Sequence, residues 1–375
     1  MSRLLWLIAG LLLFGCRGAP EEIRIGVLVG ETGARRASSG FEMTQAARLA
    51  EAAINASGGI LVKGRLHPVR VILRDIGDQA DRATSEAREL LNRDSVVALV
   101  GPQFSRDAIP VASLAEQARV PMISPMSTHP QTTSGKSFAF RVAFVDDRQG
   151  KAVALFARET LQAKRAALLY DVAMDYSRNL AQVFRAEFTA RGGVVVADEQ
   201  FTSDRAEDFT AQLTRIGATA PDVIFAPNFT SADSLQLIQA RRLRIAATFL
   251  GTDSWNAKSL QGVLEADGAY FTMLWHPAVG TVEADSFVAR YRRAYGGLPD
   301  ATAASTWDAF QVIFAAIHNA NSFDPDSIRA AIAATEGFRG VTGVLTYTQG
   351  GDPPRSVYIM RFVKGAGVLQ ARVDP

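Results

Sequence analysis

The chain has 375 residues, of which 48% are hydrophobic and 21% are charged. These proportions are typical of a soluble globular protein, and the length predicts two domains rather than one. The 40 basic and 38 acidic residues leave a net charge of +2, which gives no reason to expect nucleic acid or a strongly acidic partner.

The N-terminal segment predicts export and a membrane tether. Arg3 precedes an apolar run at residues 4–14, which is too short to span a membrane and is typical of a signal peptide. The run is soon followed by Cys16, the only cysteine in the chain, in a pattern that resembles a bacterial lipobox. We expect residues 1–15 to be removed, Cys16 to carry lipid, and residues 16–22 to form a tether. The alternative is an ordinary signal peptide with an incidental cysteine.

From residue 23 onward, short apolar runs alternate with helical patterns. Strands are predicted at residues 23–29, 69–73, 96–100, 120–123, 166–170, 194–196, 223–226, 247–250, 344–347 and 356–363. Helices are predicted at residues 43–55, 82–91, 106–118, 153–161, 179–191, 209–216, 234–241, 284–295, 302–320 and 327–334. Strands that alternate with helices of this length predict α/β lobes with parallel sheets covered on both faces.

Candidate ligand-binding residues follow the predicted strands. In the first half, Ser105 stands at a predicted helix N-cap, and Met126, Ser127 and Thr128 follow the next strand. In the second half, three further candidates follow strands, and they are Tyr176, Phe229 and Asp253. In open parallel sheets, ligands bind beyond the carboxyl ends of the strands. A ligand that contacts both halves would lie in a cleft and hold it closed.

These residue types suit a ligand with a negative and a positive group. Hydroxyls and free N–H groups at a helix start suit a carboxylate. A carboxylate such as Asp253, in a closing cleft, is costly unless a cation pairs with it. Each of these residues also has a purely structural alternative. Ser105 and Thr128 could only form caps and turns, and Asp253 could cap a helix near residue 256. Tyr176 could only pack at the start of a helix.

The sequence gives little support for catalysis. The four histidines lie far apart, and no nucleophile, zinc or phosphate-loop motif occurs. The acidic pairs Glu21-Glu22 and Asp146-Asp147 are interpreted as solvated charges near the terminus and a hinge. We therefore expect no enzyme activity, catalytic residue, metal site or cofactor.

Three segments carry a resemblance to a known family. Ser105 stands nineteen residues before an S-P-x-[ST]-T segment at residues 124–128, and INASGGI at 54–60 and FRGVTG at 338–343 are further marks. From about residue 23 to its C-terminus, the chain resembles the branched-chain amino acid binding proteins of ABC importers, which are type I periplasmic binding proteins.

The resemblance implies two doubly wound parallel-sheet lobes joined by a hinge that the chain crosses three times. Lobe 1 would comprise residues 23–146 and 276–352, and lobe 2 would comprise residues 147–275 and 353–375. No property of the periodicity alone predicts these crossings.

The resemblance also implies roles for single residues. Ser105 and Thr128 would bind a ligand carboxylate, and the Met126 carbonyl and the Asp253 carboxylate would bind an α-ammonium. Tyr176 would close over the ligand from lobe 2. Some of four apolar side chains are expected to form a pocket for the ligand side chain; the four are Phe104, Met126, Phe229 and Trp255. Of these, Trp255 is better interpreted as a core residue.

The chain departs from the family at several of these positions. Met126 stands where a small residue is usual, and Phe229 where tyrosine is common. Ser177 and Asn179 replace glycines, and the loop at residues 35–40 lacks an aromatic residue that often covers the ligand. The ligand is therefore left open among amino acids, amides, ureas and aromatic carboxylates.

The predicted function is capture of an apolar or branched-chain amino acid, in the periplasm or at the outer face of the cell membrane. The partners would be the permease subunits of an ABC importer and, through the lipid on Cys16, the membrane. Two alternatives share this fold: a ligand sensor, and a lipoprotein that activates a cell-envelope enzyme by binding it.

Overall fold

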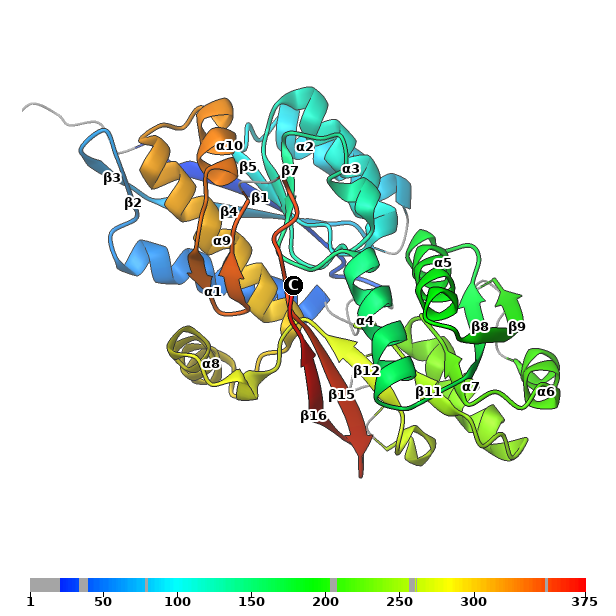
Figure 1. Cartoon of the computed structure of the whole chain (residues 1–375). Helices are drawn as coiled ribbons and strands as arrows, with labels where there is room; N and C mark the ends of the chain where they lie inside the picture. The colour runs from blue at the N-terminus through cyan, green and yellow to red at the C-terminus, as the bar shows by residue number, and fades with distance from the viewer. Residues whose placement is uncertain are drawn as a thin grey trace, which may run out of the picture.

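The computed structural model describes residues 21–33, 40–77, 80–202, 208–255, 260, 262–347 and 350–375. Two predicted features lie outside these residues: the signal peptide with Cys16, and most of the loop at residues 35–40. The described chain forms two α/β units, each built on its own twisted sheet (Figure 1). We call the unit around β1 lobe 1 and the unit around β8 lobe 2.

Lobe 1 is built on five parallel strands in the order β4-β1-β5-β6-β7. Its strands are β1 (Ile23–Val29), β4 (Val69–Asp75), β5 (Ala98–Val100), β6 (Met122–Ser124) and β7 (Ala139–Arg141). Its helices are α1 (Phe41–Ala56), α2 (Ala80–Asn92), α3 (Ser105–Ala118), α8 (Val282–Tyr295), α9 (Ala301–Ala320) and α10 (Pro325–Ala333). A hairpin of β2 (Ile60–Val62) and β3 (Arg65–His67) extends from it.

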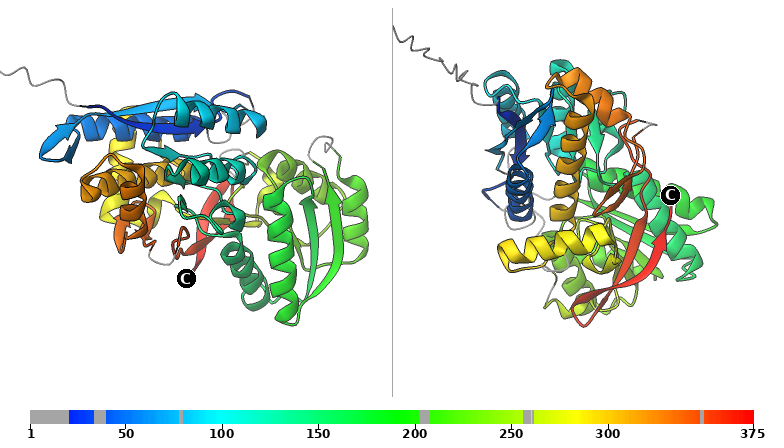
Figure 2. Two further views of the ribbon diagram at one scale, coloured as in Figure 1. Left: turned by 90° about the horizontal axis from the view of Figure 1, so that it is seen from above. Right: turned by 90° about the vertical axis from the view of Figure 1, so that its left-hand side faces the viewer.

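Helices cover both faces of this sheet because successive strand residues point to opposite sides. Ala98 and Val100 of β5 pack in one core with α1 and α9, whereas Leu99 packs in another with α2 and α3. Figure 2 shows α9 and α10 beside the N-terminal elements, although they lie far apart in the sequence.

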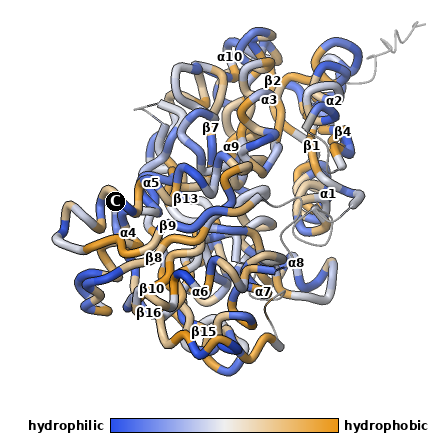
Figure 3. Tube along the Cα trace, turned by 90° about the vertical axis from the view of Figure 1, so that its right-hand side faces the viewer, coloured by the Kyte–Doolittle hydropathy of each residue, from blue (hydrophilic) through white to orange (hydrophobic). Residues whose placement is uncertain are grey.

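Lobe 2 is built on seven strands in the order β16-β15-β12-β11-β10-β8-β9. Its strands are β8 (Arg165–Asp171), β9 (Val194–Phe201), β10 (Val223–Phe225), β11 (Thr248–Leu250), β12 (Tyr270–Met273), β15 (Val357–Val363) and β16 (Ala366–Val373). The strands from β8 to β12 are parallel, but β15 and β16 are antiparallel additions. The central strands are strongly apolar, as the colouring of β8 shows (Figure 3).

The helices of lobe 2 again cover both faces of the sheet. They are α4 (Asp146–Glu159), α5 (Asp175–Ala190), α6 (Thr210–Ala218) and α7 (Thr230–Arg242). One core lies under α4 and α5, and the other lies under α6 and α7. Within the described residues, no helix has both the length and the apolar character needed to cross a membrane.

The chain passes between the two sheets three times. The first passage runs from β7 in lobe 1 to α4 in lobe 2. The second follows β12 and returns the chain to lobe 1, where it forms α8, α9 and α10. A hairpin of β13 (Phe338–Gly340) and β14 (Gly343–Leu345) precedes the last passage, after which β15 joins the sheet of lobe 2. The 3-10 turns are η2 (Pro130–Thr132), η3 (Leu264–Ala266) and η4 (Pro277–Val279). The fold is therefore α/β with two parallel-sheet lobes.

Three helix starts lie four or more residues before the predicted ones, and one of them is that of α7, which begins at Thr230 rather than at residue 234. Helix α5 begins at Asp175 rather than at residue 179, so Tyr176 lies in its first turn. Helix α4 begins at Asp146 rather than at residue 153, because the Gln149 N–H already bonds the Val145 carbonyl. Asp146, predicted to be a solvated charge, is fully buried, and that prediction is wrong.

Candidate functional site

In lobe 1, a chain of hydroxyls lies where β5 and β6 end. The Ser127 hydroxyl donates to Ser105 Oγ at 3.0 Å and lies 2.7 Å from Thr132 Oγ1. Because the Ser127 proton goes to Ser105, Thr132 must donate the second bond. The Ser105 oxygen also accepts the His129 N–H at 3.4 Å. Ser105 acts as an acceptor in both bonds, which leaves its proton for an anion.

The predicted N-cap role of Ser105 is wrong. Helix α3 begins at Ser105 itself, and Phe104 occupies the N-cap position without a side-chain cap. The reason is that the Ala108 N–H bonds the Phe104 carbonyl at 2.9 Å. The Ser105 hydroxyl is therefore not engaged in capping, and it stands at the positive end of the helix.

A buried arginine that sequence reasoning missed holds the loop after β6. Arg141 donates to the Ser127 carbonyl at 2.8 Å and to the His129 carbonyl at 2.9 Å. It also donates to Thr133 Oγ1 at 2.7 Å and to Asp352 Oδ1 at 2.6 Å. Burial lowers the pKa of Arg141, and the nearby Asp352 carboxylate partly opposes this effect. The sequence signal was weak, because Arg141 interrupts an apolar run at residues 138–145 in which no strand was predicted.

In lobe 2, Asp253 is the acceptor at the centre of the site. Its Oδ1 accepts the Tyr176 hydroxyl and the Gln149 side-chain amide, each at 2.6 Å. The same amide nitrogen lies 2.7 Å from Thr272 Oγ1, which fixes Gln149 against β12. Burial raises the pKa of Asp253, and the bonds from Tyr176 and Gln149 act in the opposite direction. Burial and the Asp253 charge raise the pKa of Tyr176, which therefore remains a neutral donor.

Aromatic rings join the two lobes. The Phe104 ring of lobe 1 meets the Phe229 ring of lobe 2 edge-on, with centroids 5.5 Å apart. Phe229 also packs against Tyr176, at 5.4 Å between centroids. Met126 lies to one side, where its sulfur accepts the Ser305 hydroxyl at 3.3 Å. Trp255 is buried in the core of lobe 2, which confirms that it is core.

A second buried carboxylate, which the sequence interpretation placed in solvent, also lies between the lobes. Asp146 accepts the Asn179 side-chain amide on Oδ2 at 3.0 Å. Its backbone N–H bonds the Thr128 carbonyl at 2.8 Å, and its Oδ1 has no partner within the described part of the chain. Burial raises the pKa of Asp146 to about 7, and the Asp253 charge adds to the rise.

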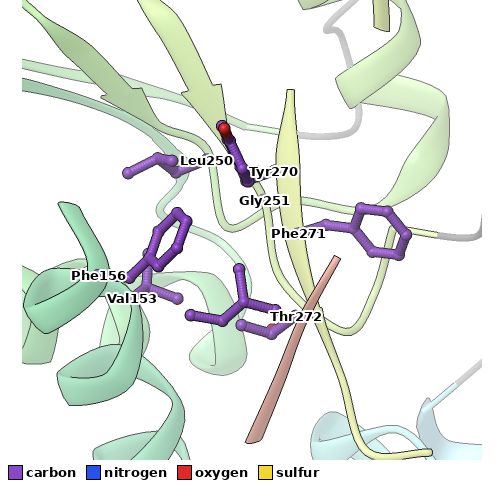
Figure 4. A pocket seen from close by; sticks show the side chains of 8 residues that line it. Val153, Phe156, Leu250, Gly251, Tyr270, Phe271 and Thr272 are labelled. Atoms are coloured by element: carbon purple, nitrogen blue, oxygen red, sulfur yellow. The ribbon is translucent and has the colours of Figure 1, made fainter. Parts of the chain in front are cut away.

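A small apolar pocket, lined in part by Thr272, lies between α4 and strands β11 and β12 (Figure 4). Its lining side chains include Val153, Phe156, Leu250 and Tyr270. None of the predicted ligand-binding residues lines it. Among the described residues, no three histidine, cysteine or acidic side chains are placed to hold a metal ion.

The structure thus places all the predicted residues at the carboxyl ends of parallel strands. Ser105, Ser127 and Thr128 offer hydroxyls from lobe 1, and Asp253 offers a carboxylate from lobe 2. Polar groups on two opposed lobes are the arrangement expected of a two-lobed protein that holds a small solute between its lobes.

Comparisons with known proteins agree with this class. The model of the periplasmic binding protein family matches residues 22–367. The chain belongs to the periplasmic binding protein family, and it is similar to members named as leucine-binding or Leu/Ile/Val-binding proteins. It is a substrate-binding protein of the ABC-importer type and not an enzyme.

Three relatives illustrate the similarity. A Leu/Ile/Val-binding protein, BraC3 of Rhizobium johnstonii, is 28% identical over 89% of each chain. The leucine binding protein LivK of Thermotoga maritima is 31% identical, with a TM-score of 0.86 over 94% of this chain and 99% of that one. LivJ of Streptococcus pneumoniae, solved in complex with isoleucine, is 29% identical, with a TM-score of 0.85 over 95% of this chain and 99% of that one.

Proposed function

We propose that the protein captures an apolar, branched-chain amino acid between its two lobes and delivers it to the permease subunits of an ABC importer. One observation carries the proposal: the Ser105 hydroxyl with its unused proton and the Asp253 carboxylate stand on opposite lobes that Phe104 and Phe229 bring together. A donor for a carboxylate and an acceptor for an ammonium suit the two ends of a zwitterion. The similarity to leucine-binding and Leu/Ile/Val-binding proteins supports the same ligand class.

Each predicted residue then has a role. The Ser105 and Thr128 hydroxyls and the Thr128 N–H bind the ligand carboxylate, and Ser127 orients Ser105. The Met126 carbonyl and Asp253 bind the α-ammonium. The rings of Phe104, Phe229 and Tyr176 cover the apolar side chain. The lobes rotate about the three passages between the sheets to enclose the ligand.

The proposal includes export and attachment to the membrane. Cleavage before Cys16 and lipidation of its thiol would tether the protein at the periplasmic or outer face of the cell membrane. Residues 16–22 would then separate the anchor from lobe 1. A tethered protein keeps its ligand close to the permease, because the tether raises the effective concentration.

A thermal-shift screen of the twenty amino acids and simple carboxylates tests the ligand. An amino acid at 100 times its Kd should add about 2.7 kcal/mol to the free energy of unfolding. Leucine, isoleucine and valine should give the largest shifts. A larger shift with benzoate or an amide than with these three would contradict the proposed ligand class.

A further inference from the structure

We propose that the face of the β2–β3 hairpin that carries Leu61 and Leu66 rests on the anionic surface of the membrane to which the protein is anchored. The inference rests on the proposed lipid anchor at Cys16, and it adds a second point of contact beside that anchor. The hairpin stands at the end of lobe 1 that points away from lobe 2 (Figure 1, Figure 2).

The first argument is the course of the chain before β1. The Glu21 carbonyl lies 2.8 Å from His67 Nδ1 at the end of β3. The Ile23 N–H bonds the Pro68 carbonyl at 2.9 Å, just after β3. Because β1 and β4 are parallel and β3 leads into β4, the chain traced backward from β1 runs along β3 toward the tip of the hairpin. The tether therefore begins beside the hairpin.

The second argument is the length of the tether. Glu21 stands five residues after Cys16, so a fully extended chain places the lipid about 18 Å from Glu21 at most. The tip of the hairpin, at Gly64, is three residues from His67, or about 10 Å along the strand. An anchor on Cys16 therefore holds this end of lobe 1 next to the lipid headgroups.

The third argument is the outer face of the hairpin. Leu61 and Leu66 are directly opposed, so their side chains share one face, where they are 43% and 49% exposed. Ile60 and Val62 point the other way and are buried in the core of lobe 1. A strand with one buried face usually carries polar residues on the other. Two opposed leucines on the outer face depart from this rule, and an apolar contact explains them.

The fourth argument is charge. Lys63 and Arg65 are exposed at the turn of the hairpin, and residues 57–70 include no acidic residue. The acidic pair Glu21-Glu22 lies at the base of the hairpin, where Glu22 accepts a bond from Arg24. Basic residues beside apolar ones suit a bilayer that contains anionic lipids. The cations attract the headgroups, and the leucines enter the boundary beneath them.

The size of this face favours a membrane over a folded protein as the partner. A stable interface between proteins buries roughly 800 Å² on each side, far more than two half-exposed leucines supply. A tethered contact needs much less, because the anchor raises the effective concentration of the hairpin at the lipid surface. The membrane is therefore the occupant that a small apolar and basic face can hold.

The test is fluorescence of the lipidated full-length protein in vesicles. Since the lipid occupies Cys16, the only native cysteine, Leu66→Cys offers a single thiol for an environment-sensitive dye. The vesicles contain phosphatidylcholine, about 30% phosphatidylglycerol and some lipid brominated on its acyl chains. Bromine should quench this dye at least about threefold more than a dye at Val194→Cys. Val194 is the matched control, because it is 57% exposed on β9 of lobe 2.

A second comparison tests the role of charge. Lys63→Gln with Arg65→Gln should weaken the contact roughly thirtyfold, because each basic residue near an anionic surface contributes about fivefold. High salt should have a similar effect. The control is Arg241→Gln with Arg242→Gln, which removes two exposed charges from lobe 2 and should leave the quenching unchanged. Both double variants should bind leucine as the wild type does, because neither touches the proposed binding site.

The outcomes separate this inference from the proposed function. If mass spectrometry finds no lipid on Cys16, the proposed anchor and this inference are both wrong. If the lipid is present but the dyes at residues 66 and 194 are quenched alike, only this inference is wrong. The soluble Cys16→Ala protein gives a last check without vesicles. If rising protein concentration shields its dye at residue 66, the face is a contact between copies of the chain, and the inference is wrong.

Discussion

The Tyr176 hydroxyl donates a 2.6 Å hydrogen bond to Asp253 Oδ1 and so joins the first turn of α5 to the loop after β11. The sequence places these residues 77 positions apart. Their contact means that Asp253, the proposed acceptor of the ammonium, is oriented before a ligand arrives. A preoriented acceptor binds with less loss of side-chain entropy.

The first prediction concerns this acceptor. Asp253→Ala should weaken amino acid binding by ~3–5 kcal/mol, or a factor of roughly 10² to 10³ or more, because it removes a buried partner of the ammonium. Asp253→Asn should lose less, because the amide oxygen still accepts. Calorimetric titration measures both, with the exposed Asp285→Asn as control. If Asp253 is only a turn residue, both variants should alter the melting temperature and leave affinity within a few fold.

The second prediction concerns the stability of the ligand-free protein. The pKa of Asp146 is raised to about 7, so its favourable contribution is complete below its unfolded pKa near 4 and is lost as the pH rises through 7. Asp146→Asn cannot ionise, so it should be more stable than the wild type at pH 8, by roughly 1–4 kcal/mol. Melting temperatures at pH 5 and pH 8 measure this difference. Equal destabilisation at both pH values would contradict it.

The third prediction concerns Arg141. Arg141→Met removes the donors that hold the loop carrying Ser127 and His129, and should lower the free energy of unfolding by about 2–3 kcal/mol. Ligand affinity should fall about tenfold, because Ser127 and Thr128 lose their fixed positions. Chemical unfolding and titration measure the two effects. The control is Arg119→Met, because its ion pair with Asp326 is exposed and screened by solvent, so neither quantity should change appreciably.

The fourth prediction concerns closure. Saturating leucine should reduce the radius of gyration in solution scattering, as the lobes rotate near Asp146, Trp275 and Gly351. Phe229→Ala removes the ring contacts with Phe104 and Tyr176 and should weaken binding by about tenfold. Identical scattering curves with and without leucine would count against a hinged site.

The fifth prediction concerns the N-terminus. Protein isolated from membranes should carry lipid on an N-terminal Cys16, and Cys16→Ala should release or mislocalise it. Mass spectrometry of the intact protein measures this modification. Recovery of mature protein that begins at residue 17 or later would contradict the lipid anchor.

Much of the fold was predictable because the signals are local. Alternating apolar strands and helices predicted parallel sheets covered on both faces, and the ends of those strands located Ser105, Thr128, Tyr176 and Asp253. Five short strands were missed because three or four residues carry too little periodicity; these are β2, β3, β7, β12 and β13. The longer β16 was also missed, because it is an edge strand without a buried face. Helix starts were also uncertain, as α4 and α5 show.

The sequence by itself determined the class of fold, the family and the residues at the strand ends, because spacing and hydrophobic pattern are properties of neighbouring residues. Only the tertiary structure decided which polar groups are buried. From the sequence, Asp146 is interpreted as a solvated charge beside Asp147. In the structure, Asp146 is buried because α4 packs between the lobes. Arg141 likewise holds the loop after β6 only because folding brings β7, that loop and Asp352 together. Burial depends on contacts between distant segments, and it is burial that gives these charges their chemistry.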